Sequence, residues 1–276
     1  MFSKLRSLIF KFDPETAHNL AIKSLKFNFV SNIFDENKND PMFQTNLFGK
    51  QIDNPIGLAA GFDKNAEVYN SLFRLGFGFV EVGTVTPLKQ YGNPKPRVFR
   101  LEEDQALINR LGFNSFGANN VNSTIRSNPP NGLLGVNIGP NKDTKDKLND
   151  YLICLKTFHD IADYITINIS SPNTENLRDF HDQNKFEKLI SSIEKAMKEL
   201  KSNTPIVVKI SPDILNEQAA QISEILLNYN IKAIIVSNTT DGNREKLLNV
   251  SKSQKGGLSG KPLETRSNQL INTFYN

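Results

Sequence analysis

The chain has 276 residues, of which 38% are hydrophobic and 22% are charged, and its formal net charge is +4. This composition is typical of a folded globular protein and excludes disordered and fibrous chains. The single cysteine, Cys154, can form neither an internal disulfide nor a cysteine metal cluster, so redox chemistry would need a bound cofactor. No apolar run approaches the roughly 18 residues of a membrane span, and the first 30 residues do not resemble a secretory signal. We therefore expect neither a spanning nor a secreted protein.

The first 40 residues predict an amphipathic helical extension. Apolar residues recur at helical spacing from Phe2 to Phe12, and Asp13-Pro14 then predicts an N-cap and the first turn of a second helix. Residues 1–30 hold five basic and two acidic residues, whereas the rest of the chain is almost neutral. Such helices suit an anionic membrane surface, and the alternative is a helical hairpin packed on its own domain. Polar residues 35–41 predict a linker to a second domain at 41–276.

Beyond the linker, six short apolar runs predict β-strands. They are residues 54–59, 79–84, 133–138, 164–169, 205–210 and 233–238. Helical stretches such as 186–200 and 217–228 separate most of them, which indicates a parallel sheet covered on both faces. Polar residues follow nearly every strand, as in the active site of a (β/α)8 barrel, although a doubly wound sheet would share the pattern. A barrel needs eight units, and only six precede the last predicted helix at 262–276.

Several strand ends and loops carry candidate ligand-binding residues. The first strand ends in small residues followed by Lys64, and Lys209 closes the fifth strand. The long connection 86–117 contains Arg100 and reads as a folded active-site loop, and 256–260 reads as a glycine-rich loop of backbone donors. Amides and cations with almost no carboxylates suggest a planar, anionic, amide-bearing ligand.

The fourth predicted strand breaks at Pro172, which leaves Ser171 and Asn173 on a loop over the barrel mouth. Taken alone, this sequence favours a simple turn over a functional loop. The three histidines, at positions 18, 159 and 181, form no triad-like motif with a serine, so hydrolysis is not expected.

Taken together, the motifs resemble the class 2, quinone-dependent dihydroorotate dehydrogenases along the whole chain. They are 13–18 (DPETAH), 57–64 (GLAAGFDK), 81–87 (EVGTVTP), 109–114 (NRLGFN), 137–139 (NIG), 168–173 (NISSPN), 238–240 (NTT) and 256–260 (GGLSG). The resemblance implies an FMN-dependent (β/α)8 barrel that oxidises dihydroorotate to orotate in de novo pyrimidine (UMP) biosynthesis. It also implies that electrons pass to a membrane quinone entering between the N-terminal helices, on the cytoplasmic face of the cell membrane, to which the protein binds peripherally.

The resemblance assigns roles to residues by position. Ser171 resembles the family's base, where class 1 relatives use cysteine, and Thr174 and Phe113 would line its proton path. Substrate contacts are implied for Lys64, Asn109, Arg110, Leu111, Gly112, Phe113, Asn168, Asn173, Asn238 and Thr239. Flavin contacts are implied for Ala60, Gly61, Phe62, Asp63, Lys64, Thr84, Asn137, Asn168, Lys209, Ser237 and Gly260, and quinone contacts for His18 and Arg100. Ser237 stands where close relatives have threonine.

The family continues through two further strand-helix units that hold the flavin phosphate. We therefore expect a chain shortened at its C-terminal end, with open strand edges and weakened flavin binding and activity. Three other functions share parts of the pattern: a barrel lyase with a Schiff base on Lys209 or Lys64, a flavin-dependent tRNA-modifying reductase, and an inactive membrane-associated fragment. The reductase is disfavoured because it would need a catalytic cysteine and a basic main domain. No nucleic-acid partner is expected, because the basic residues are not concentrated on the main domain.

Overall fold

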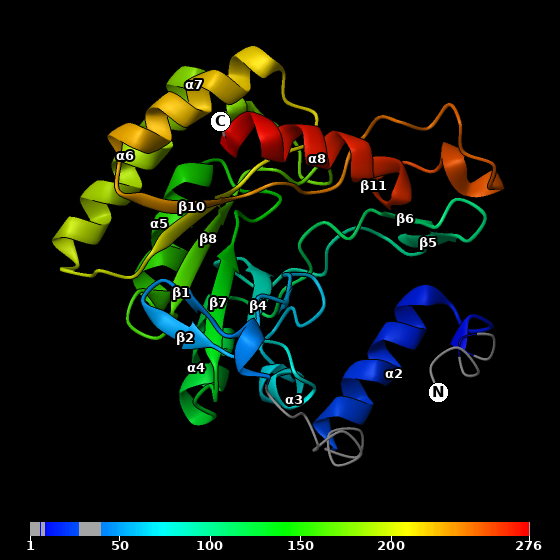
Figure 1. The fold of residues 1–276 in the computed structure, drawn as a ribbon, viewed down its shortest axis with the longest axis horizontal. Coiled ribbons are helices and arrows are strands. Elements are labelled where there is room, and N and C mark those ends of the chain that lie inside the picture. Colours follow the sequence, from blue (N-terminus) through cyan, green and yellow to red (C-terminus); the bar gives the residue numbers. More distant parts are fainter. Residues whose placement is uncertain (1–5, 7–8, 28–39, 276) are drawn as a thin grey trace.

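The computed structural model describes residues 6, 9–27 and 40–275 (Figure 1). The helices are α2 (Pro14–Lys26), α3 (Tyr69–Arg74), α4 (Ala118–Ser127), α5 (Lys147–Phe158), α6 (Gln183–Glu199), α7 (Asn216–Asn228) and α8 (Lys261–Tyr275), with short 3-10 turns η2 (Pro41–Phe43), η3 (Arg178–His181) and η4 (Val250–Ser253). The strands are β1 (Thr45–Leu47), β2 (Lys50–Ile52), β3 (Gly57–Leu58), β4 (Phe79–Val85), β5 (Val98–Leu101), β6 (Ala106–Asn109), β7 (Leu133–Ile138), β8 (Tyr164–Asn168), β9 (Ile206–Lys209), β10 (Ile231–Ile235) and β11 (Gly257–Gly260).

A six-stranded parallel sheet in the order β10-β9-β8-β7-β4-β3 forms the centre of the molecule. Each strand falls within or across one of the predicted apolar runs. Figure 1 shows the sheet curled, with α5, α6 and α7 along its outer face. The buried aliphatic residues of β4, β7, β8 and β9 pack against these helices in one continuous core. This is an α/β arrangement whose strand ends meet at one mouth.

The first and last strands of the sheet differ most from their predicted bounds. Only Gly57–Leu58 pair in the first run, because the side chain of Asn54 accepts a hydrogen bond from the backbone N–H of Ile56 (2.9 Å) and forms a turn there. The last strand begins at Ile231 and ends at Ile235, three residues before the predicted end. These two strands are the ends of the sheet order.

The β1–β2 hairpin covers the sheet at the amino ends of the parallel strands. Ile52 of this hairpin packs with Leu133, Tyr164 and Val207, which lie at or near the beginnings of their strands. The core is therefore sealed at the amino ends of the strands, and the carboxyl ends stay available for a site.

Two segments predicted as loops instead form a small antiparallel sheet in the order β11-β6-β5. Strands β5 and β6 lie inside the 86–117 connection, and β11 forms the glycine-rich segment 256–260. The backbone of β11 runs so close to Thr239 that a Cβ built on Gly257 would lie 1.9 Å from the Thr239 Oγ1 atom. Glycine is therefore required for this close approach, and the sheet becomes a wall of the mouth.

Helix α2 lies beside the β5–β6 hairpin (Figure 1). The carboxylate of Asp13 accepts a hydrogen bond from the Thr16 backbone N–H (2.9 Å), which confirms the predicted N-cap. Ile22 and Leu25 join the core, whereas Leu20 is 48% exposed. Most of the first predicted helix and residues 35–39 of the predicted linker lie outside the described residues. Among the described helices, none combines the length and hydropathy needed to cross a bilayer.

Candidate active site

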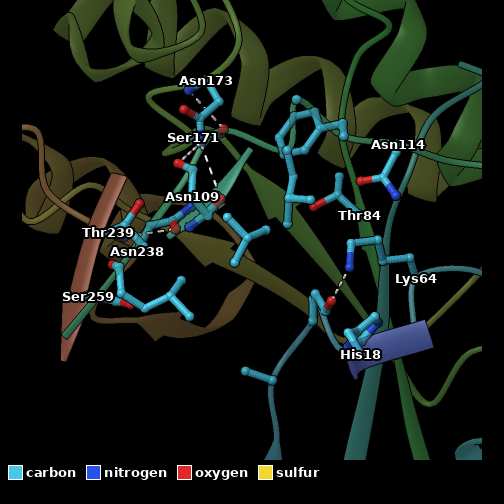
Figure 2. Close-up of a pocket in the computed structure, with 18 of the residues that line it drawn as sticks. His18, Lys64, Thr84, Asn109, Asn114, Ser171, Asn173, Asn238, Thr239 and Ser259 are labelled. Atoms are coloured by element: carbon cyan, nitrogen blue, oxygen red, sulfur yellow. Dashed lines mark hydrogen bonds between the residues drawn. The ribbon is translucent and has the colours of Figure 1, made fainter. Parts of the chain in front are cut away.

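A cavity of about 740 Å³ lies at the carboxyl ends of the parallel strands. One wall comes from residues at or just beyond the ends of β3, β4, β8, β9 and β10, and the small antiparallel sheet forms another. Helix α2 supplies Pro14, Glu15, Ala17 and His18 to the remaining side. Figure 2 shows Ser171, Asn109, Asn173, Asn238 and Thr239 grouped together, apart from Lys64 and His18.

Ser171 lies on the cavity wall and is 6% exposed. The backbone N–H of Asn173 donates a hydrogen bond to Ser171 Oγ (3.2 Å), which favours negative charge on that oxygen. The Asn173 side chain in turn donates to the backbone carbonyl of Asn109 (3.1 Å) and so joins the serine loop to the end of β6. A serine held in this way can act as a proton acceptor for a bound ligand.

Two buried hydroxyl groups, those of Ser170 and Thr84, position the amides of Asn168 and Asn238 beside Ser171. Ser170 Oγ donates to Asn168 Oδ1 (2.8 Å) and accepts a hydrogen bond from Asn238 Nδ2 (2.9 Å). The Asn168 amide also donates to Thr84 Oγ1 (3.0 Å). The orientation of each amide is therefore set by its neighbours before any ligand arrives.

A second layer of polar groups lies beneath the cavity. Asn137 is 0% exposed, donates to Glu81 Oε1 (2.8 Å) and accepts a hydrogen bond from Thr84 Oγ1 (2.6 Å). Thr166 Oγ1 donates to the other carboxylate oxygen of Glu81 (2.7 Å). Glu81 thus fixes which way the Asn137 amide points, and Asn137 acts on the site through Thr84 and Asn168.

The 109–114 segment folds into a tight turn that directs side chains into the cavity. Gly112 and Phe113 both have positive φ, at 70° and 52°, and the Gln90 side chain donates to the carbonyls of both. Asn114 follows, and its Oδ1 atom is buried with no hydrogen-bond partner among the described residues. An unpaired buried acceptor in a cavity wall is costly unless a ligand or water supplies a donor.

Charged residues occupy the α2 side of the cavity. Lys64 donates to the backbone carbonyl of Gly61, and burial lowers the pKa of Lys64 to about 8. Burial, aided by the charge of Lys64, lowers the pKa of His18 to about 4, so this imidazole is neutral at pH 7. Its ring meets that of Phe62 edge-on at 5.1 Å.

Most of the predicted site residues do line the cavity. They are His18, Ala60, Gly61, Lys64, Thr84, Arg100, Asn109, Leu111, Gly112, Phe113, Asn168, Ser171, Asn173, Lys209, Ser237, Asn238 and Thr239. Lys209 is buried, with 9% of its surface exposed.

Other predicted residues do not line the cavity. They are Phe62, Asp63, Arg110, Asn137, Thr174 and Gly260. The Asp63 carboxylate turns inward to accept hydrogen bonds from two backbone N–H groups at 2.8 Å, and burial raises its pKa. Arg110 turns outward to the Pro96 carbonyl (2.8 Å) and to Gln254 (2.9 Å). Gly260, the last residue of β11, pairs with Ala106, and Thr174 is buried with 5% exposure directly after Asn173.

Sequence reasoning missed several residues of the site. Asn114 and Ser259 line the cavity, and Ser170 orients two of its amides. Asn114 stood at the end of a recognised motif, and its unpaired acceptor could not be seen without coordinates. Ser259 was hidden because its segment was interpreted as a loop.

Comparison with known proteins gives the family. The family model described as "Dihydroorotate dehydrogenase" matches residues 42–276. The chain belongs to the dihydroorotate dehydrogenase family. A relative from Buchnera aphidicola subsp. Schizaphis graminum, named dihydroorotate dehydrogenase (quinone), is 44% identical, with 98% of this chain and 83% of the relative covered. One of the same name from Bartonella tribocorum is 46% identical, with 96% and 74% covered.

Solved structures agree with this membership. The Eimeria tenella dihydroorotate dehydrogenase crystallised in complex with ferulenol superposes with a TM-score of 0.90 at 37% identity, over 95% of this chain and 76% of that one. The curled parallel sheet therefore fits the α/β barrel of the dihydroorotate dehydrogenases, and the class 2 identification made from the sequence motifs is confirmed.

Proposed function

We propose that this chain oxidises dihydroorotate to orotate in de novo pyrimidine (UMP) biosynthesis, with FMN as the bound cofactor and a membrane quinone as the final electron acceptor. The observation that carries the proposal is the placement of Ser171. Ser171 lines the cavity together with Asn109, Asn168 and Asn173, and its Oγ accepts a hydrogen bond from the backbone N–H of Asn173. Relatives named dihydroorotate dehydrogenase (quinone) support the same reaction.

The cavity suits a flavin and a small ring compound together. Its volume of about 740 Å³ lies within the usual range for such sites. A Cβ built on Gly61, whose φ is 113°, would meet nothing within 4 Å, so this backbone leaves space for a flat ring. The unpaired Asn114 Oδ1 offers an acceptor, and Lys209 offers a buried cation at the end of β9. When bound, FMN accepts the hydride from C6 of dihydroorotate and passes electrons on to the quinone.

Ser171 takes the proton from C5 of dihydroorotate in this proposal. The Asn173 N–H stabilises negative charge that develops on Ser171 Oγ as the proton is received. The amides of Asn109, Asn168, Asn173 and Asn238, together with Thr239, hold the substrate ring, because they can donate to its carbonyls and accept from its N–H groups. Phe113, which lines the cavity, and the buried Thr174 would line the path of this proton.

Lys64 is proposed to neutralise the carboxylate of dihydroorotate. Lys209 would stabilise negative charge on the reduced flavin, and Ala60, Gly61, Thr84 and Ser237 would pack against or hydrogen-bond the ring. Asn137 would act on the flavin site through Thr84, as the hydrogen bonds beneath the cavity indicate.

The quinone is proposed to enter beside α2, past His18 and Arg100. Both residues line the cavity, and the neutral, half-buried imidazole of His18 suits an uncharged quinone. The basic N-terminal segment supports binding to an anionic membrane surface at the cytoplasmic face of the cell membrane. No nucleic-acid partner is proposed.

The experiment is steady-state oxidation of dihydroorotate by the FMN-loaded chain with a soluble quinone, followed by detection of orotate. We expect orotate to form in proportion to the quinone reduced. Borohydride treatment in the presence of a carbonyl substrate tests the lyase alternative at Lys64 or Lys209. Covalent trapping of that substrate without orotate formation would contradict the proposal and favour the Schiff-base reaction.

A further inference from the structure

Arg178 joins three loops at the mouth of the sheet. It is the first residue of η3, in the connection between β8 and α6, and its side chain is 22% exposed. Its Nε donates to the backbone carbonyl of Ser170 (3.1 Å), and its Nη2 donates to the backbone carbonyl of Thr239 (2.9 Å). One guanidinium thus holds the loop after β8 and the loop after β10 together.

Two carboxylates hold the guanidinium from the other side. Arg178 Nη1 lies 2.8 Å from Asp213 and 2.8 Å from Asp241. Asp213 belongs to the loop after β9, and it also accepts hydrogen bonds from the Thr240 hydroxyl and from the Asp241 backbone N–H (3.0 Å). Arg178 therefore has partners in three consecutive strand-end loops.

The backbone of η3 is fixed as well. His181 Nδ1 lies 2.9 Å from the Arg178 carbonyl, and the Ser211 backbone N–H donates to His181 Nε2 (3.2 Å). The imidazole is 3% exposed and connects η3 to the end of β9. His181 therefore fixes the backbone at Arg178 independently of the contacts made by the Arg178 guanidinium.

Both carbonyls held by Arg178 belong to the site. Ser170 precedes Ser171 in the chain, and its hydroxyl orients the amides of Asn168 and Asn238. Thr239 itself lines the cavity. A shift of either carbonyl would move the proton acceptor relative to the amides that hold the substrate.

We propose that Arg178 is a positioning residue that sets the distance between Ser171 and the Asn238–Thr239 pair, an inference that rests on the proposed function. Arginine suits this task because its planar fork donates along several fixed directions at once, whereas the lysine ammonium is a single point charge. Asp213 and Asp241 keep the fork in place and balance its charge.

The test compares FMN-loaded wild type with Arg178→Met, a variant of similar length that has no donors. We expect hydrogen exchange to rise at residues 170–174 and 239–241. Flavin reduction by dihydroorotate should slow by about tenfold to 100-fold and orotate should bind more weakly, because misplacement by about 1 Å costs this much. Reoxidation of the reduced protein by a soluble quinone should not change, since the partners of Arg178 among the described residues lie in the loops after β8, β9 and β10 and not on the α2 side of the cavity.

Arg126→Met is the control. Arg126 of α4 also donates to two partners, the side chains of Asn122 (2.9 Å) and Asp160 (2.6 Å), and neither partner belongs to the loops after β8, β9 and β10. This variant should leave hydrogen exchange at both segments and flavin reduction unchanged. Arg178→Lys keeps the charge, and we expect it to restore thermal stability but only part of the reduction rate.

Three results would overturn the proposal. The first is unchanged hydrogen exchange at both segments in Arg178→Met, and the second is an equal loss in the two half-reactions, flavin reduction by dihydroorotate and reoxidation by quinone. The third is full recovery of the flavin reduction rate in Arg178→Lys. The Lys variant also decides the matter if Arg178→Met does not fold. A wild-type chain whose flavin is not reduced by dihydroorotate would instead contradict the proposed function. In that case hydrogen exchange alone still decides whether Arg178 ties the loops.

Discussion

The two sides of the cavity are built from different chemistry. On the strand-end side, neutral amides and hydroxyls are cross-linked to one another, as in the contacts of Asn168 with Thr84 and Ser170. On the α2 side, Arg97 donates two hydrogen bonds to the Glu15 carboxylate, at 2.6 and 3.0 Å, beside the apolar packing of Ile22 and Leu25. The amides and hydroxyls that line the strand-end side do not titrate near neutral pH, whereas the Arg97–Glu15 contact on the α2 side depends on charge. The comparison suggests chemistry on the first side and quinone access on the second.

The largest effect should come from the strand-end side. Ser171→Ala removes the proposed base while leaving the neighbouring amides in place. We expect flavin reduction by dihydroorotate to fall by at least about 10²-fold, the contribution of a positioned base. Orotate binding should stay close to that of wild type, and rapid mixing measures both. Ser171→Cys should keep some activity with a pH profile shifted toward thiol ionisation, and an unchanged reduction rate in Ser171→Ala would remove Ser171 from its role.

On the α2 side, Glu15→Gln should loosen the attachment of the helix. Glu15 is 12% exposed and Arg97 is 7% exposed, so each lost charge-assisted hydrogen bond should cost about 1.5 to 3 kcal/mol. Turnover with a long-chain quinone should fall several-fold, while reduction of the bound flavin at saturating dihydroorotate should not change.

Lys95→Met is the control for this change. The Lys95 ammonium lies 3.4 Å from the same carboxylate but is 62% exposed, and such exposed pairs contribute little. Equal effects of Glu15→Gln on both half-reactions would show that the two sides of the cavity are not separate.

The affinity for orotate should depend on pH through Lys64. Burial lowers the pKa of Lys64 to about 8, so its positive charge is present below that pH and is lost above it. Binding of an anion to the charged form should therefore weaken by up to about tenfold per pH unit above pH 8. Lys64→Arg should remove this dependence, because arginine stays charged. Constant affinity between pH 7 and 9.5 in wild type would contradict a contact with the orotate carboxylate.

A smaller change is expected in stability at acid pH. Burial lowers the pKa of His181 to about 4, below its value in the unfolded chain, so the unfolded chain binds more protons as the pH falls below about 6.5. The contribution of His181 to stability is present above that pH and is lost toward pH 4, by about 2 kcal/mol between pH 7 and 5. Urea unfolding of wild type and His181→Asn at both pH values measures the difference. An equal loss in both proteins would assign the acid sensitivity to other groups.

The sequence predicted the elements whose signals are local. Strands β4, β7, β8 and β9 are continuous apolar runs, and Asp13-Pro14 is a local helix start, so each could be found from neighbouring residues. Ser171, Asn109, Asn168, Asn173 and Asn238 were assigned through the motifs of the family resemblance, and all of them line the cavity.

What could not be predicted depends on partners far apart in the chain. Strand β11 pairs with β6, which lies about 150 residues earlier in the chain, and each strand is only four residues long. Arg178 takes its role from carbonyls and carboxylates of three loops. Asp63 and Arg110 looked like site residues because of their motifs, but nearby backbone groups satisfy them away from the cavity.

The most direct test of the central claim, that the strand-end side forms a dihydroorotate site, is an anaerobic titration of the FMN-loaded chain with dihydroorotate. The proposed function predicts that the flavin absorbance bleaches with one orotate formed per flavin, and that added quinone restores the colour. A flavin that stays oxidised while dihydroorotate remains intact would contradict it.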